Sequence, residues 1–335
     1  MTTTPPSSVV VVPHGVFRRI APAIVLFFCS PFVAEYLLGN ISIDMLTAMV
    51  ALAPLYGGGA VLVREISRRI GGGWPTILLL ALAYGLMEEG LVIQTLFNPH
   101  YLGLSLLDEA FIPALGIGGW WTFFVLTLHT IWSISVPIAV VEALFSSRGA
   151  TPWLGKPGLG VTTLLCAAGA AMIYLGTRRQ DPFTASALQL TCVGAAILIV
   201  IVLAFRVRGK SERGPGAVPP AWVVGFSTFI LGLAFMSSHA VLRGWILVGL
   251  YVAIYAVALF LLTRWSRRTH WTPMHTLAAG GGAMVTYACT AFPQVPVIGS
   301  KGTIDLVGNI VFALIAVALL ILAAKAVKRT AVGLS

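Results

Sequence analysis

Long apolar segments separated by short polar stretches dominate the chain from residue 20 to residue 326. Because an α-helix rises about 1.5 Å per residue, about 20 apolar residues are enough to cross the hydrocarbon core of a bilayer. Such segments occupy residues 20–38, 43–63, 75–95, 119–145, 161–177, 187–205, 221–239, 244–263, 271–291 and 304–326. The pattern therefore predicts an all-α bundle of about ten transmembrane helices.

The composition supports a membrane protein and excludes several other classes. Hydrophobic residues make up 58% of the chain and charged residues 10%, whereas about a quarter of residues are charged in soluble domains. Cys29, Cys166, Cys192 and Cys289 all fall within predicted helices without CxxC spacing, so we interpret them as packing residues. The sequence also lacks a P-loop or dinucleotide fingerprint, which argues against an ATP-driven pump within this chain.

Basic residues predict the orientation of the bundle. Lysine and arginine are retained on the cytoplasmic side during insertion. With the N-terminus inside, 17 of the 21 basic residues fall in cytoplasmic loops or tails, and only Arg178, Arg179, Arg243 and Lys301 fall outside. The sequence thus predicts a multi-pass protein of the plasma (inner) membrane with both termini cytoplasmic. The net charge of +10 is then a topology signal and an attraction to membrane lipids, not to nucleic acid.

Glycine and proline suggest a division of the chain. Residues 206–220 are rich in both and predict a cytoplasmic linker. This linker would separate a six-span bundle, 20–205, from a four-span bundle, 221–335, with residues 1–19 as a cytoplasmic tail. The triple glycines Gly57 to Gly59 and Gly280 to Gly282 indicate either close helix contacts or broken helices.

Three glutamates lie inside apolar segments: Glu35, Glu88 and Glu89. An acidic residue at the centre of a transmembrane helix costs about 2.5–3.5 kcal/mol, so such residues mark functional sites by default. The structural alternative is a protonated carboxyl that donates a hydrogen bond between helices. The sequence leaves both interpretations open.

A histidine in the next predicted helix falls at a similar depth. Glu88 and Glu89 lie roughly 20 Å along the third segment from Pro75, and His129 lies roughly 15 Å along the fourth from Gly119. Antiparallel helices would place all three slightly above the midplane, in the outer half. Glu88 and Glu89 point about 100° apart on an ideal helix, so they can converge on one point only through a local distortion.

Further polar candidates also fall toward the outer half. Ser133 follows His129 by four residues, on the same helix face. Glu35, His239, Asp305 and Asn309 lie in the outer halves of the first, seventh and tenth segments. Any function is therefore expected in a polar cavity in this half.

The chemistry of these residues fits more than one function. A divalent metal such as zinc could be held by Glu89 and His129, with a carboxylate left as general base, as in a hydrolase. Buried carboxylates and a histidine could equally form the protonation switch of a proton- or ion-coupled transporter. A non-catalytic assembly factor with glutamates paired inside the bundle is a third possibility.

One local resemblance favours the hydrolase. The run YGLMEEGLVIQTLF at residues 84–97, followed by FFVLTLH at residues 123–129, resembles two motifs of the CAAX prenyl protease and bacteriocin-processing (CPBP) intramembrane family. That family carries a Glu-Glu pair on one helix and a histidine after a phenylalanine on the next. The resemblance implies a glutamate-dependent intramembrane hydrolase.

The resemblance also implies roles for individual residues. Glu88 or Glu89 would activate water, and His129 would be the partner of that glutamate. The chain departs from the family at Ile93, where the family has arginine, and at Phe124, which precedes His129 by five residues rather than four. No match to the family's later His-x-x-x-Asn motif is present, although Asp305 and Asn309 keep its spacing.

The loop at residues 96–118 is too apolar for a solvated tether. It could be a lid over the polar cluster, a re-entrant segment, or an interfacial helix anchored by Trp120 and Trp121. The sequence does not choose among the three.

Overall fold

The computed structural model describes residues 16–207 and 213–333. Most of the predicted tail, and part of the predicted linker 206–220, lie outside the described residues. The helices are α1 (Val16–Pro31), α2 (Ala48–Arg69), α3 (Trp74–Met87), α4 (Gly119–Thr127), α5 (Val136–Leu144), α6 (Lys156–Gln180), α7 (Ala187–Arg206), α8 (Ala221–Ser237), α9 (Gly244–Ser266), α10 (Pro273–Thr290) and α11 (Thr303–Val332). The predicted all-α fold is confirmed.

Shorter elements continue or connect these helices. Three π-helical segments, η1 (Phe32–Tyr36), η3 (Glu88–Val92) and η5 (Leu128–Ser135), extend α1, α3 and α4. Three 3-10 turns are η2 (Ile43–Met45), η4 (Tyr101–Gly103) and η6 (Ser238–Ala240). A two-stranded antiparallel hairpin pairs β1 (Phe111–Ile112) with β2 (Ile117–Gly118).

Nine helical segments in the described chain are long and apolar enough to cross a membrane. They include α6, which at 25 residues is longer than the predicted segment 161–177. The continuous run of α4, η5 and α5 forms one of them, from Gly119 to Leu144. The ninth predicted segment, now α10, is not among them, because its glycines, threonines and histidine make it less apolar.

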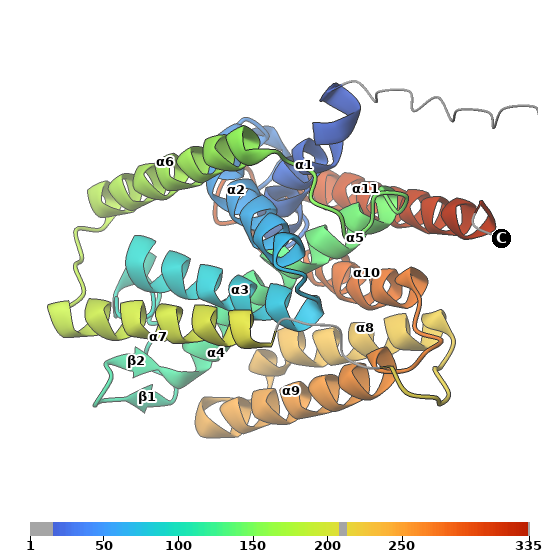
Figure 1. The fold of residues 1–335 in the computed structure, drawn as a ribbon. Helices are drawn as coiled ribbons and strands as arrows, with labels where there is room; N and C mark the ends of the chain where they lie inside the picture. The colour runs from blue at the N-terminus through green and yellow to red at the C-terminus, as the bar shows by residue number, and fades with distance from the viewer. Residues whose placement is uncertain (1–15, 208–212, 334–335) are drawn as a thin grey trace, which may run out of the picture.

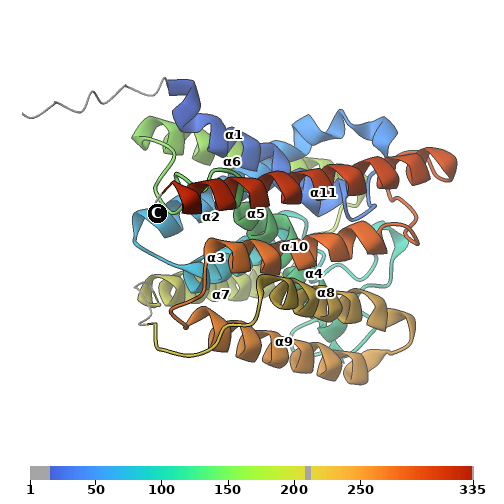
Figure 2. The ribbon, with the colours of Figure 1, turned by 90° about the vertical axis from the view of Figure 1, so that its right-hand side faces the viewer.

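The helix α10 nevertheless runs alongside the others. It packs against α8, α11 and α5, and Figure 2 shows it nearly parallel to α11. In the same view α1 begins and α11 ends at the same end of the bundle. We call this the near end and the opposite end the far end. A helix surrounded by protein need not present an apolar face to lipid.

The centre of the bundle is formed by the early spans. Figure 1 shows α6, α7, α9 and α11 around the outside, with α3 and α5 nearer the middle. The first four spans are 56% to 67% buried inside the protein, whereas α6 and α7 are only 11% buried. The outer helices therefore present most of their apolar side chains to lipid.

Both triple glycines lie inside continuous helices, so the broken-helix interpretation is wrong for them. A Cβ atom on Gly57 of α2 would lie 1.9 Å from the backbone oxygen of Phe27 in α1. A Cβ on Gly282 of α10 would lie 2.1 Å from the backbone oxygen of Gly225 in α8. These positions accept only glycine because the paired helix backbones touch there.

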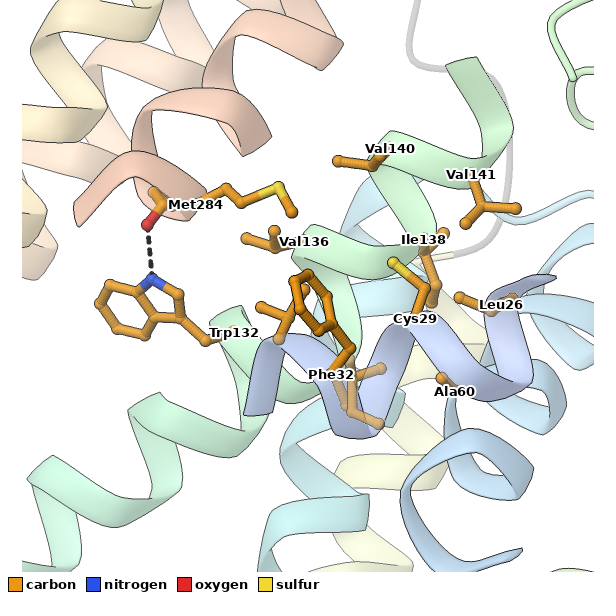
Figure 3. Packing of buried hydrophobic residues seen from close by; sticks show 14 of the residues in the cluster. Leu26, Cys29, Phe32, Ala60, Trp132, Val136, Ile138, Val140, Val141 and Met284 are labelled. Carbon is orange, nitrogen blue, oxygen red and sulfur yellow. Dashed lines mark hydrogen bonds between the residues drawn. The ribbon is translucent and has the colours of Figure 1, made fainter. Parts of the chain in front are cut away.

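Aromatic packing joins the early spans to α10. The Trp132 ring stacks on Tyr287 at 4.6 Å between ring centres, and its indole N–H donates to the backbone oxygen of Ala283 at 2.7 Å. Figure 3 shows this bond beside the buried side chains of Phe32 and Met284. The hydrogen bond satisfies the only polar atom of the Trp132 side chain. It also fixes the position of η5 along the axis of α10.

A buried ion network lies toward the near end. Arg64 is fully buried, pairs with Glu65 at 2.6 Å and with Glu142 at 3.0 Å, and lies 3.5 Å from the centre of the Trp153 ring. Glu65, also fully buried, accepts hydrogen bonds from the backbone N–H groups of Trp153 and Leu154. The network therefore ties α2 to α5 and to the loop before α6.

Candidate functional site

Three π-helical segments carry the candidate residues of the polar site. Glu35 lies in η1, Glu88 and Glu89 open η3, and His129 lies in η5. π-Helical turns make up well under 1% of residues in proteins and are frequent at functional sites. Three spans therefore leave the α-helical path where they carry these ionisable groups.

The imidazole of His129 lies between the two adjacent glutamates. Its Nδ1 is 3.1 Å from Glu88 Oε2, and its Nε2 is 2.7 Å from Glu89 Oε1. The exposed fractions are 0% for Glu88, 4% for Glu89 and 5% for His129. An ideal helix would point the two carboxylates about 100° apart. The π-helical turn that begins at Glu88 supplies the local distortion that lets both reach His129.

The chain beyond η3 turns back over the cluster. Gln94 adopts a left-handed backbone conformation with φ of 65°, which an L residue occupies only at a cost. Thr95 then donates from its hydroxyl to Glu89 Oε2, and the indole N–H of Trp121 donates to Thr95 Oγ1 at 3.0 Å. Glu89 is thus held by His129 on one oxygen and by Thr95 on the other.

Glu35 joins the same group through α2. Its carboxylate accepts hydrogen bonds from the Tyr56 hydroxyl at 2.5 Å and from Asn40 at 3.1 Å. The Tyr56 ring stacks on the imidazole of His129 with 6.0 Å between ring centres. Ser133 lies next to the same imidazole, with its Oγ 3.4 Å from Nδ1.

Glu88 differs from Glu89 because its carboxylate lacks a well-aligned hydrogen bond. Among the described residues neither of its oxygens accepts a hydrogen bond of ordinary geometry, and the buried hydroxyl of Tyr84 also makes none of ordinary geometry. The contact to His129 Nδ1 is the only ion pair of Glu88 in the described chain. A buried carboxylate with so few well-aligned donors is costly, so a further cation is expected beside it.

The cluster has the ligand atoms of a metal site. One atom each from Glu88, Glu89 and His129 lie within 4.8 Å of one another. Ligand atoms around a tetrahedral zinc ion are about 3.3 Å apart, given bonds of about 2.0–2.1 Å, so a small closure would suffice. Two carboxylates with a neutral imidazole also balance the charge of a divalent cation.

Three of the predicted candidates lie away from this cluster. His239 stacks on Trp120 at 4.1 Å between ring centres and pairs with Glu109 in the far-end loops. Asp305 and Asn309 bond to each other on α11. Helical depth alone does not separate these positions, because it carries no information on the lateral position of a helix in the bundle.

Thr95 and Tyr56 are among the contributors that were missed in the sequence. Thr95 follows the end of the third span, and no pattern indicates that the chain folds back there. Tyr56 immediately precedes Gly57, whose close contact with Phe27 brings the Tyr56 hydroxyl to Glu35 of the α1–η1 span. The triple glycine therefore could have indicated that Tyr56 lies against the first span, close to Glu35.

The loop 96–118 contains a hairpin, so the interfacial-helix interpretation is wrong. The amide of Asn98 donates to Asp181 at 2.8 Å, which anchors the start of the loop. Tyr101 is partly buried; burial, followed by the charges of Glu89 and Glu35, raises its pKa to about 12. Tyr101 of this loop is therefore neutral at physiological pH.

Glu109 anchors the middle of this loop to the start of α9 and the residues just before it. It accepts the Gly244 N–H at 3.0 Å and contacts His239 Nε2 at 3.0 Å. Partial burial alone would raise the pKa of Glu109, but Gly244, His239 and Arg243 outweigh it and hold the pKa below its usual value. Glu109 therefore stabilises the folded protein in its charged form.

The expected consequence is a pH-dependent contribution to stability. A carboxyl whose folded pKa is lowered contributes fully above its unfolded pKa, about 4.3, and the contribution is lost as the pH falls through the folded value. Glu109→Gln should cost about 1 kcal/mol at pH 7 and almost nothing at the acid end. Thermal unfolding in detergent at pH 7 and between pH 5 and 3 measures this, and a pH-independent difference would contradict it.

Comparisons with known proteins address the family. A model described as "Uncharacterized membrane protein family" matches residues 24–333. No curated protein and no solved structure matches the chain. The resemblance to the CPBP family is therefore wrong. Its two motifs fix few residues, and Ile93 and Phe124 already depart from them.

Proposed function

The chain belongs to the uncharacterized membrane protein family that matches it over residues 24–333, and on this premise we propose that it is a metal-dependent hydrolase acting within the membrane. The observation that carries the proposal is the buried carboxylate of Glu88, which lacks a well-aligned hydrogen bond, beside the Glu89 and His129 pair. Glu88, Glu89 and His129 would hold one divalent ion, with zinc best suited to such a set of oxygen and nitrogen ligands.

The ligand number supports catalysis over a purely structural ion. Structural zinc sites are usually closed by four protein ligands, whereas catalytic sites keep three and leave a position for water. A bound zinc ion would lower the pKa of that water to about 7 and polarise a carbonyl oxygen. The cluster offers three protein ligands from the described chain.

Glu35 is the proposed general base. It is not one of the three ligands, and the Tyr56 hydroxyl bonded to its carboxylate carries a ring stacked on His129. Glu35 would take the proton of the attacking water as oxygen bonds to the carbonyl carbon, and would return that proton to the leaving group. Tyr56 and Asn40 would hold the carboxylate in position for both steps.

Cation-coupled transport is the second candidate, because three π-helical interruptions and a closed site also suit an ion pathway. Discontinuous helices at a buried site are common in secondary transporters. Zinc flux into proteoliposomes tests this candidate: flux that Glu89→Gln abolishes, without any hydrolysis, would replace our proposal.

Basic residues also support a proposed orientation, in which the near end faces the cytoplasm of a plasma membrane. The near end carries the last turns of α2, α9 and α11, which include Arg69, Arg264 and Arg329. Fusion of a reporter to the C-terminus, read in intact cells, tests this orientation.

A substrate-independent assay tests the hydrolase. Hydrolysis places one oxygen atom of water in a product, so zinc-loaded protein incubated with a membrane extract in ¹⁸O-water should generate ¹⁸O-labelled products detected by mass spectrometry. Glu35→Gln should retain zinc within about twofold yet lose at least 100-fold of the labelling rate, since a general base contributes about 10²–10⁴-fold.

The control for this assay is Glu109→Gln, which changes a glutamate outside the cluster and should label at the wild-type rate. Labelling that persists at full rate in Glu35→Gln would remove Glu35 from the mechanism. Absence of zinc-dependent labelling in the wild-type protein would remove the hydrolase while leaving the metal site in place.

A further inference from the structure

A groove of about 830 Å³ runs along α9 toward the near end. Its lining changes along its length from apolar side chains to arginines. The lining residues are Gly214, Ala256, Leu259, Phe260, Thr263, Arg264, Arg267 and Arg268. No acidic side chain of the described chain lines it.

The lining follows a single stripe of the helix. Ala256, Leu259, Phe260, Thr263 and Arg264 are spaced three or four residues apart along one face of α9. Leu259 is 68% exposed and Phe260 is 63% exposed. The apolar part of the groove therefore opens to the bilayer and suits a hydrocarbon chain.

The arginine end is ordered by the segment after residue 212. Gly214 donates its N–H to the backbone oxygen of Arg267, and Thr269 donates back to Gly214. The guanidinium of Arg268 donates to the backbone oxygen of Pro215 at 2.7 Å. Arg264 and Arg267 remain exposed at the mouth of the groove, where they can bind a phosphate with several donors.

We propose that this groove binds an anionic phospholipid, with the phosphate at Arg264 and Arg267 and one acyl chain along Ala256, Leu259 and Phe260. A cluster of basic residues at the end of a transmembrane helix attracts anionic headgroups. The apolar stripe that continues from it adds a place for the chain of the same molecule. The site is independent of the Glu88, Glu89 and His129 cluster.

Lipid titration of the purified protein by native mass spectrometry tests the charged part. The probes are phosphatidylglycerol and phosphatidylcholine with identical acyl chains. The double change Arg264→Gln and Arg267→Gln should weaken phosphatidylglycerol binding about tenfold. The matched control, Lys325→Gln with Lys328→Gln, removes the same charge from exposed positions of α11 at the near end and should change binding less than about twofold.

A second pair of variants tests the apolar part without changing charge. Ala256→Trp fills the groove, whereas Val257→Trp places the same side chain at a neighbouring exposed position outside the lining. Only Ala256→Trp should weaken phosphatidylglycerol binding, by about fivefold or more. All four variants alter exposed side chains, so gel filtration should show folded protein.

Three results would overturn the proposal. They are equal binding of the two lipids, equal weakening by the α9 and α11 charge variants, and unchanged binding in Ala256→Trp. Displacement of the bound lipid by millimolar inorganic phosphate would show that the arginines take free phosphate instead.

Discussion

Glu89→Gln is expected to lower the zinc content of the purified protein from about one ion per chain to less than about a tenth. The amide removes one negative charge, so two carboxylates no longer balance the divalent ion, and it is a weaker ligand. The affinity for zinc should fall more than 100-fold, because losing even a residue that only hydrogen-bonds to a metal ligand costs about 10–100-fold. Elemental analysis after dialysis against a trace of free zinc measures the effect.

The control is Glu109→Gln, which changes a far-end glutamate that pairs with His239 and should keep the full zinc content. Negligible metal in the wild-type protein, after purification with added zinc, would end the metal interpretation. In that case the Glu88, Glu89 and His129 cluster would not be a metal site, and the hydrolase proposal would fall with it.

Glu65→Gln should destabilise the folded protein by about 3–5 kcal/mol, the usual effect of breaking a buried ion pair from one side. Glu65 pairs with Arg64 at 2.6 Å and Arg69 at 3.2 Å and also accepts two backbone N–H groups. Glutamine leaves fully buried Arg64 with Glu142 as its one remaining ion-pair partner in the described chain and turns an N–H₂ group toward other donors. Thermal unfolding in detergent, followed by intrinsic tryptophan fluorescence, measures the loss.

Asp108→Asn provides the matched control, because it makes the same change of charge at an exposed loop position and should cost less than about 0.5 kcal/mol. A loss below about 1 kcal/mol in Glu65→Gln would mean that water replaces the missing contacts.

The fold was predictable because lipid imposes a simple rule on sequence. Every backbone polar group must be bonded within the span, so each long apolar segment becomes a helix. The helix α10 was harder to assign because it is enclosed by α5, α8 and α11 and needs no apolar surface. The hairpin in loop 96–118 depends on local turns that the apolar composition of the loop does not indicate.

The site was predictable only in part. The cost of burying Glu88, Glu89 and His129 directed attention to them, and helical depth placed them at one level. Depth could not distinguish Ser133, which lies beside His129, from His239, which lies in the far-end loops. Those distinctions depend on helix packing, which a single sequence specifies through small residues such as Gly57 only indirectly.

The three π-helical turns have a consequence for sequence comparison. Such a turn holds one residue more than an α-helical turn, so the helix beyond it is rotated by about 100° relative to an uninterrupted helix. A relative with straight helices would align to this chain only with a one-residue gap within each of η1, η3 and η5. Single-residue insertions at these three places would therefore show which members of the family acquired the cluster, and in which order the three turns arose.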